Sequence, residues 1–139
     1  MKSNKGSNSL FADQEEFMKA GDAAIASTEV SAEMLAVELI EEEFEEFMDE
    51  NCYLSTGNLN SLKEAIDLIY VCCQYMNTVV GAEKAQKLWD TVHAHNMSKT
   101  QGGKLIKRAD GKILKPEGFD KEAWVKGFLA ILDVEEEGT

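Results

Sequence analysis

Two short acidic motifs carry the residues whose types and spacing could do chemistry. Glu43 and Glu46 lie in the run EEEFEE, and Glu64 and Asp67 lie in KEAID. Residues three apart in a helix lie one turn apart on the same face. Each motif therefore presents two carboxylates in one direction, which is a pattern that can bind a cation.

The remaining acids of the first motif have a simpler explanation. At about 100° per residue, they point toward or past the side opposite the apolar stripe of their helix, so solubility alone accounts for them. These residues are Glu41, Glu42, Glu45 and Asp49. Glu43 and Glu46 instead share a face with Leu39, at the edge where the helix meets a neighbour. We therefore expect the carboxylates of these two residues to lose water.

A divalent metal is the predicted partner of the two acid pairs. Burying a carboxylate without a partner costs several kcal/mol, and Lys63 is the only Lys or Arg between residues 20 and 83. Two pairs from neighbouring helices would place four oxygen ligands around one point in a dry interior. Such a site favours Mg²⁺, with Mn²⁺ able to substitute. The alternative is that all four acids form a solvated face.

A cationic segment follows the acidic motifs and suggests the class of substrate. Six of the fourteen basic residues lie between Lys99 and Lys115, against one acid, Asp110. Magnesium held by carboxylates commonly bridges phosphate oxygens and activates a water for in-line attack. Lys and Arg side chains could then neutralise the phosphates of a small polyanion from the other side.

The composition argues against several other classes of protein. A formal charge of −12 over 139 residues argues against binding to a nucleic-acid polymer, which needs clustered cations. No stretch approaches the roughly 20 apolar residues that cross a bilayer, and no GxxxxGK[ST] loop occurs. We therefore expect one cytoplasmic domain over residues 1–139, with residues 1–8 as a flexible terminus and residues 134–139 as an acidic tail.

The apolar pattern predicts an all-α fold, a four- to five-helix bundle with a short hairpin near the C-terminus. A first short helix is expected from Ser9 to near Gly21, and a second from an N-cap at Ser31 to about Glu50. The apolar residues of the second helix are spaced three, four and three apart, which is typical of one buried stripe. They are Val37, Ile40, Phe44 and Phe47.

The second half of the chain predicts two longer helices, a hairpin and a last helix. The helix over residues 59–80 is apolar nearly all round, so it should be covered on several sides. The next helix is expected over residues 81–97, followed by a hairpin that turns at residues 109–112. The last helix is expected over residues 120–133.

The order of the motifs resembles that of the all-α nucleoside triphosphate pyrophosphohydrolases, a superfamily that includes MazG, the dimeric dUTPases and phosphoribosyl-ATP pyrophosphohydrolase. LIEEEFEEF (39–47) is similar to the EExxE helix of these enzymes, and KEAIDLIYV (63–71) is similar to their ExxD helix. VHAHNMSK (92–99) and DGKILKP (110–116) are similar to the VHxxNMSK and DGKxLK segments of the MazG-like, phage-type branch. The resemblance covers roughly residues 10–119.

The resemblance implies a role for each motif. The implied magnesium ligands, in agreement with the spacing of the acids, are Glu43, Glu46, Glu64 and Asp67. The implied substrate contacts are Asn96 and Lys99 to the nucleotide, and Lys112 and Lys115 to its phosphates, the latter two from the same or a neighbouring subunit. Members of the family assemble as homodimers or dimers of dimers. The unbroken run of acids at 41–46 leaves the register of the EExxE motif open by one residue.

The expected activity is Mg²⁺-dependent hydrolysis of ribo- or deoxyribonucleoside triphosphates to the monophosphate and pyrophosphate, for housekeeping of the nucleotide pool. Glu42 is the expected general base, on a side of the helix that should be exposed in a monomer. Two alternatives stay open: phosphoribosyl-ATP pyrophosphohydrolase, which the segments 92–99 and 110–116 disfavour, and a non-catalytic helical interaction protein. No pattern indicates which base or sugar is preferred.

Overall fold

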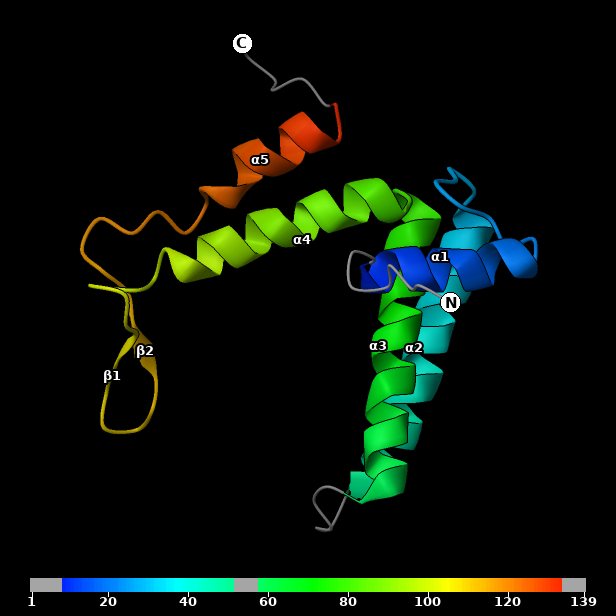
Figure 1. Ribbon diagram of the computed structural model, residues 1–139, viewed down its shortest axis with the longest axis horizontal. Helices are drawn as coiled ribbons and strands as arrows, with labels where there is room; N and C mark the ends of the chain where they lie inside the picture. The colour runs from blue at the N-terminus through cyan, green and yellow to red at the C-terminus, as the bar shows by residue number, and fades with distance from the viewer. Residues whose placement is uncertain (1–8, 52–57, 134–139) are drawn as a thin grey trace, which may run out of the picture. The chain divides into compact units, whose positions relative to one another are not determined.

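The computed structural model describes residues 9–51 and 58–133 and is mostly helical (Figure 1). Its elements in chain order are α1 (Leu10–Ala20), α2 (Val30–Asn51), α3 (Leu59–Val79), α4 (Ala82–Met97), β1 (Ile106–Lys107), β2 (Ile113–Leu114) and α5 (Trp124–Ile131). The predicted all-α class with a short hairpin is confirmed. The expectations for residues 1–8 and 134–139 lie outside the described residues.

The chain divides into two compact units, Met1–Ala85 and Gln86–Thr139. The boundary falls within α4, so the first unit holds α1, α2, α3 and the first turn of α4. The second unit holds the rest of α4, the hairpin and α5. That residues 1–139 act as one domain stays a prediction.

Local capping explains where α1 begins and ends. The Ser9 side chain accepts a hydrogen bond from the Ala12 amide at 3.0 Å, which satisfies a free donor of the first turn. At the other end, the Gly21 amide donates to the carbonyls of Phe17 and Met18. Both predicted ends of this helix are confirmed.

The prediction of an N-cap at Ser31 is wrong. Helix α2 begins at Val30, one residue earlier, so Ser31 lies within the helix. The chain already turns at Ser27, whose hydroxyl accepts a hydrogen bond from the Glu29 amide at 3.0 Å. The Glu29 carbonyl then accepts from the Glu33 amide, so helical bonding starts before Ser31 is reached.

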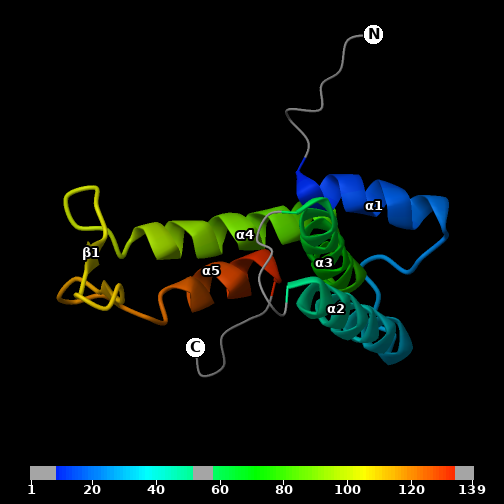
Figure 2. The ribbon, with the colours of Figure 1, turned by 90° about the horizontal axis from the view of Figure 1, so that it is seen from below.

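Helices α2 and α3 lie side by side and form the main packing of the first unit (Figure 2). The inward side of α2 is marked by Ala36, which is fully buried, and by Ile40, Glu43 and Phe47, which are half-buried. These positions are four, three and four residues apart, as one helical stripe requires. The stripe therefore includes a carboxylate, Glu43, at a position where an apolar residue would normally pack.

The predicted buried stripe of α2 is half wrong, since Val37 and Phe44 are each 49% exposed. The 3-4-3 spacing correctly placed the four apolar residues on one face of the helix, but α3 packs to one side of that face. Only Ile40 and Phe47 turn toward it enough to become half-buried. Among the described residues, no element packs over Val37 and Phe44 closely enough to bury them.

Helix α3 begins at a capped turn, in which the Asn58 side chain accepts a hydrogen bond from the Ser61 amide at 2.7 Å. Its apolar character predicted cover on several sides, which the structure contradicts along its N-terminal half. Leu59 is 84% exposed, and Leu62 and Ile66 are also exposed. The reason is that α1 contacts α3 from its middle toward its C-terminal end: Phe17 and Tyr70 pack edge to face, and Gln14 binds Asn77.

None of the described helices alone is long and apolar enough to cross a membrane. Among the described helices, α3 and α4 reach the length and apolar composition of a membrane span only when taken together, and the chain bends between them at residues 80–81.

A buried polar cluster joins α1 to the C-terminal half of α3. The Asn77 side-chain amide donates to the Gln14 side chain and to the Phe11 carbonyl, each at 2.9 Å, and both Asn77 and Gln14 are fully buried. The Asn77 carbonyl accepts from the amides of Ala26 and Gly81. One residue thus ties α1, the loop after α1 and the end of α3 to one another.

The next turn of the chain is tied to the same region. Gly81 has a φ of 85°, a left-handed conformation that glycine adopts without steric cost, and it ends α3. The Ala82 amide, at the start of α4, donates to the Glu15 carboxylate of α1 at 2.8 Å. A carboxylate at a helix N-terminus satisfies a free amide and interacts favourably with the helix dipole.

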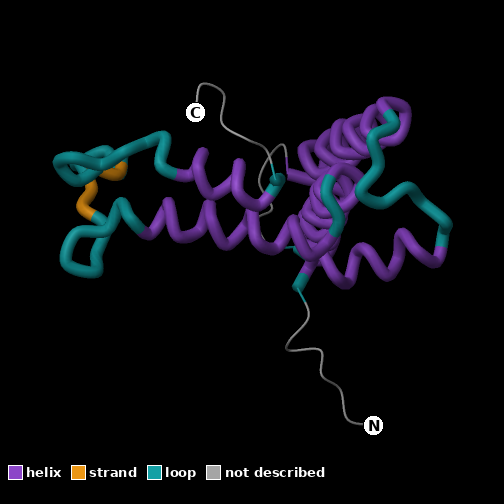
Figure 3. The backbone as a smooth tube through the Cα atoms, turned by 90° about the horizontal axis from the view of Figure 1, so that it is seen from above, coloured by secondary structure: helices purple, strands orange, loops and turns teal. Residues whose placement is uncertain are grey.

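In the second unit, the predicted hairpin is confirmed (Figure 3). Ile106 pairs with Leu114 and Lys107 with Ile113 in antiparallel register. The turn closes through Asp110, whose carboxylate accepts from the Lys112 amide at 3.0 Å and forms an ion pair with Arg108 at 2.6 Å. The aliphatic side chains of both strands are exposed.

The last helix is shorter than predicted, because residues 121–123 form turns before α5 begins at Trp124. Trp124 and Phe128, one turn apart, stack edge to face with ring centroids 4.9 Å apart. A Cβ atom at Gly127 would lie 2.8 Å from the Thr91 methyl carbon of α4, so only glycine permits this approach of α5.

We predict that Asn77→Ala destabilises the first unit by about 2–4 kcal/mol, because it leaves buried acceptors on Gln14 and Phe11 without a donor and opens a cavity. Urea unfolding followed by circular dichroism measures the change. Asn60→Ala, at an exposed position on the same helix, should change stability by less than about 0.5 kcal/mol. Equal stability of the two variants would contradict the prediction.

Candidate metal site

Three of the predicted metal ligands converge between α2 and α3. One carboxylate oxygen each from Glu43, Glu64 and Asp67 lies within 4.8 Å of the other two. Glu43 comes from the inward stripe of α2, and the other two residues come from successive turns of α3. The spacing of three residues in the sequence therefore brings these two acids of α3 to one place, as predicted.

Glu46, the fourth predicted ligand, is exposed but belongs to the same group of charges. The negative charge of Glu43 and a hydrogen bond with its side chain raise the pKa of Glu46 above its ordinary value. A hydrogen bond with Glu64 acts in the opposite direction on Glu46. The side chain of Glu46 on α2 thus interacts with an acid of its own helix and with one of α3. We call Glu43, Glu46, Glu64 and Asp67 the acidic cluster.

The acidic cluster has carboxylate oxygens without partners. One oxygen of Glu43 and one of Glu64 (Oε2 in each) are buried and accept no hydrogen bond from the described residues. Burial, and secondarily the charge of Glu46, raises the pKa of Glu64 above its ordinary value. Like charges at short range and loss of water both disfavour the ionised form. The cluster therefore holds negative charge at a free-energy cost that a cation would offset.

The expected dry interior needs a correction. Glu43, Glu64 and Asp67 are half-buried rather than buried, and Glu46 is exposed. The cluster lies at the rim of the α2–α3 contact, where carboxylates keep one side toward solvent. A phosphate-sized ligand could approach such a rim, whereas it could not enter the interior.

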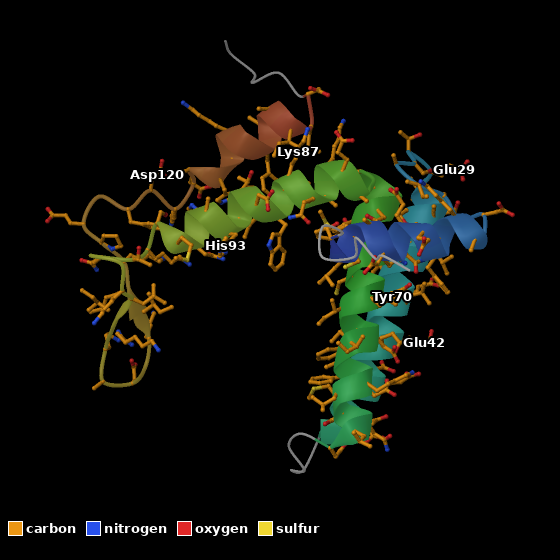
Figure 4. The ribbon with its side chains drawn as sticks, in the orientation of Figure 1. Glu29, Glu42, Tyr70, Lys87, His93 and Asp120 are labelled. Atoms are coloured by element: carbon orange, nitrogen blue, oxygen red, sulfur yellow. The ribbon has the colours of Figure 1, made fainter. Side chains whose placement is uncertain are left out.

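The acids assigned to a solvated face are exposed, as predicted. They are Glu41, Glu42, Glu45 and Asp49. Glu42, the expected general base, projects from α2 (Figure 4), and its charge contributes to the raised pKa of Glu46. It therefore lies near the acidic cluster without belonging to it.

Lys63 belongs to the site, although the sequence analysis noted it only as the one nearby base and gave it no role. Its ammonium nitrogen lies 2.6 Å from Asp67 Oδ2. The hydrogen bond to Asp67, and then the charges of Asp67, Glu64 and Glu43, raise the pKa of Lys63. The signal was present in the sequence, because residues four apart on a helix are neighbours, but one exposed ion pair of this kind is common and by itself indicates nothing.

The predicted substrate contacts lie in the second unit. The Lys99 ammonium lies 3.3 Å from the Asn96 side-chain oxygen, just after the end of α4. The Lys115 ammonium lies 5.7 Å from the centre of the Phe119 ring, which in turn contacts His95. Lys112 is exposed at the hairpin turn. The structure thus joins Asn96 to Lys99, and their contact with a nucleotide stays a prediction.

Neither a protein-family model nor a curated protein sequence matches this chain. Assignment of a function therefore depends on the chemistry and geometry of the residues above and on the motif order in the sequence.

The acidic cluster suits a hard divalent cation. In an octahedral Mg²⁺ site the oxygen ligands lie about 2.1 Å from the metal, so ligands on opposite sides are about 4 Å apart. Three oxygens within 4.8 Å of one another can reach that arrangement with small side-chain movements. The donors are all carboxylates, which magnesium and manganese prefer over the nitrogen and sulfur ligands typical of zinc.

We predict that the metal-free Glu64→Gln variant has a higher melting temperature than the wild type at neutral pH. A carboxyl group with a raised pKa in the folded state contributes most stability when protonated, and this is lost as the pH rises through the folded-state pKa. The difference should therefore shrink toward about pH 4, near the ordinary glutamate pKa.

Differential scanning calorimetry in the presence of a chelator measures this effect. Glu41→Gln, on the exposed face of α2, removes the same charge from outside the acidic cluster and should raise the melting temperature less. A Glu64→Gln variant that melts below the wild type at neutral pH would show that the carboxylate is stabilising, contrary to the prediction.

Proposed function

We propose that this protein is a Mg²⁺-dependent hydrolase that cuts ribo- or deoxyribonucleoside triphosphates into the monophosphate and pyrophosphate, as a nucleotide-pool housekeeping enzyme. The observation that supports this most is the convergence of Glu43, Glu64 and Asp67 from two helices, with buried oxygens that have no partner among the described residues. The motif order in the sequence, which resembles the MazG-like branch, suggests the reaction.

A bound magnesium ion would offset part of the negative charge of the triphosphate and lower the pKa of a coordinated water. Four residues of this chain would hold it: Glu43, Glu46, Glu64 and Asp67. Mn²⁺ would substitute, since it takes the same ligands. The half-buried position of the cluster leaves room for phosphate oxygens on the solvent side.

In the proposed reaction, a water oxygen bonds to the α phosphorus, and the bond to the oxygen bridging the α and β phosphorus atoms breaks. Pyrophosphate leaves with the bridging oxygen. Glu42 takes the proton from the water, because it is exposed to solvent yet near the charges of the cluster. If the motif is shifted by one residue, Glu42 or Glu45 holds a ligand place assigned to its neighbour.

The second unit would supply the cations that bind the substrate. Asn96 and Lys99 would contact the nucleotide, and Lys112 and Lys115 its phosphates. The exposure of the hairpin supports this, because Lys107 and Lys112 are exposed and no ion pair joins them to an acid within residues 86–133. The acid of the hairpin, Asp110, is paired with Arg108. An ammonium group binds phosphate as a point charge and needs no fixed geometry.

A homodimer or dimer of dimers is part of the proposal. The N-terminal half of α3 and one face of α2 expose large apolar side chains, which a monomer in water would not favour. They include Leu59, Leu62, Ile66 and Ile69 on α3 and Val37, Phe44 and Met48 on α2. A second copy covering these side chains would complete the cover that α3 lacks.

The same exposed surface supports the alternative of a non-catalytic interaction protein. In that case the acids would be tolerated as a partly solvated face neutralised by Lys63. A phosphoribosyl-ATP pyrophosphohydrolase would use the same cluster on a different nucleotide. Assays with and without an intact cluster separate the first alternative from an enzyme, and a substrate panel separates the second.

We predict pyrophosphate release from at least one nucleoside triphosphate in a panel of ribo- and deoxyribonucleotides that includes phosphoribosyl-ATP, only when Mg²⁺ or Mn²⁺ is present. Colorimetric detection of pyrophosphate measures turnover. No turnover of any member of the panel would contradict the proposed enzymatic activity. Turnover of phosphoribosyl-ATP alone would favour the alternative of a phosphoribosyl-ATP pyrophosphohydrolase.

We predict that Glu43→Gln and Asp67→Asn each lower kcat by more than the roughly 10- to 100-fold typical of losing an outer-shell partner of a metal, while circular dichroism stays like that of the wild type. Glu41→Gln, at an exposed position on α2 with no place in the proposed site, serves as the matched control and should keep turnover within about twofold. Wild-type activity in all three variants would rule out the acidic cluster as the catalytic centre.

We predict that the wild type sediments as a dimer or tetramer in analytical ultracentrifugation and that Ile66→Glu shifts it toward the monomer, because a charge on the apolar face of α3 opposes burial. Leu10→Glu, at another exposed apolar position on α1, should keep the wild-type assembly. A monomeric wild type would contradict the assembly without touching the metal site.

A further inference from the structure

We propose that Lys63 is a resident counter-cation of the acidic cluster, which competes with the divalent metal for Asp67 and so sets the metal concentration at which the site fills. This inference rests on the proposed metal site and concerns its regulation.

The competition follows from one shared carboxylate, that of Asp67. The Lys63 ammonium lies 2.6 Å from Asp67 Oδ2, while Asp67 is also one of the three residues whose oxygens converge. A carboxylate that gives an oxygen to a metal ion has part of its negative charge offset, so it attracts an ammonium group less strongly. The ammonium group of Lys63 and a divalent cation from solution therefore cannot both bind the Asp67 carboxylate at full strength.

The charges around Lys63 favour its place beside the cluster in the absence of a metal. Glu64 and Glu43, as well as Asp67, attract the ammonium group and raise its pKa. Between residues 20 and 83 the chain has no other Lys or Arg. The positive charge that offsets the three carboxylates along this stretch of α2 and α3 is thus carried by one side chain.

Lys63 is also placed so that it can leave. Its side chain is 70% exposed, and a four-carbon stem lets the ammonium group rotate into water. On a helix, an ion pair in which the lysine precedes the acid by four residues is weaker than a pair in the opposite order. The stability of α3 therefore does not require the Lys63–Asp67 pair. A metal ion can therefore displace the ammonium group without unfolding α3.

The test measures Mn²⁺ binding by the full chain without nucleotide, using isothermal titration calorimetry. We expect Lys63→Gln to bind Mn²⁺ about three- to tenfold more tightly than the wild type, because no cation has to be displaced. Lys63→Arg keeps the charge and should bind Mn²⁺ no more tightly than the wild type.

Lys19→Gln is the matched control. Lys19 forms an ion pair at 3.3 Å with Glu15, four residues earlier on α1, a helix that contributes no residue to the acidic cluster. It removes the same charge from the same unit and should leave the Mn²⁺ dissociation constant unchanged. A tightening equal to that of Lys63→Gln would show an effect of net charge alone and would overturn the inference.

The outcomes separate this inference from the proposed function. If the wild type and Lys63→Gln bind Mn²⁺ with the same affinity, the role of Lys63 is overturned and the metal site stands. Absence of Mn²⁺ binding in both proteins overturns the metal site and the inference together. Lys63→Gln should also have a lower melting temperature than Lys19→Gln in chelator, since the cluster then lacks its counter-cation.

Discussion

The packing of α2 against α3, with carboxylates at its rim, is the constraint on which the rest of the structure depends. Glu43 lies on the inward stripe of α2, between the apolar residues Ile40 and Phe47. Packing these apolar side chains therefore carries a carboxylate into the contact with α3. Glu64 and Asp67 meet it there, so the hydrophobic contact that holds the pair together also forces like charges close to one another.

A separate set of contacts holds α3 in place, and it does not involve the acidic cluster. Asn77 and Gln14 fix α1 to the C-terminal end of α3, about three turns beyond Asp67. Glu15 then anchors the start of α4. Because stability and charge are carried by different ends of α3, the cluster can keep an unfavourable arrangement of carboxylates while the fold is held by hydrogen bonds and packing elsewhere.

The sequence predicted what depends on neighbours along the chain and failed where distant elements decide. Spacings of two to four residues account for the ends of α1, for the hairpin turn at Asp110, and for the position of Glu64 and Asp67 on one face of α3. The exposure of Phe44 and Leu59 does not, because it depends on where α1 and α3 lie. Ser31 misled because its residue type suits a cap, whereas the turn at Ser27 starts the helix earlier.

The apolar surface and the acidic cluster can serve different purposes because they occupy different faces of α3. Successive residues of a helix are about 100° apart, so Ile66 and Asp67 point in nearly perpendicular directions. Leu62 and Ile66 share a face, four residues apart, and Glu64 and Asp67 share another. A second copy that covers Leu62 and Ile66 would thus leave the rim with Glu64 and Asp67 open to solvent. Association through the apolar face and access of a metal with its phosphate ligand are therefore compatible on one helix.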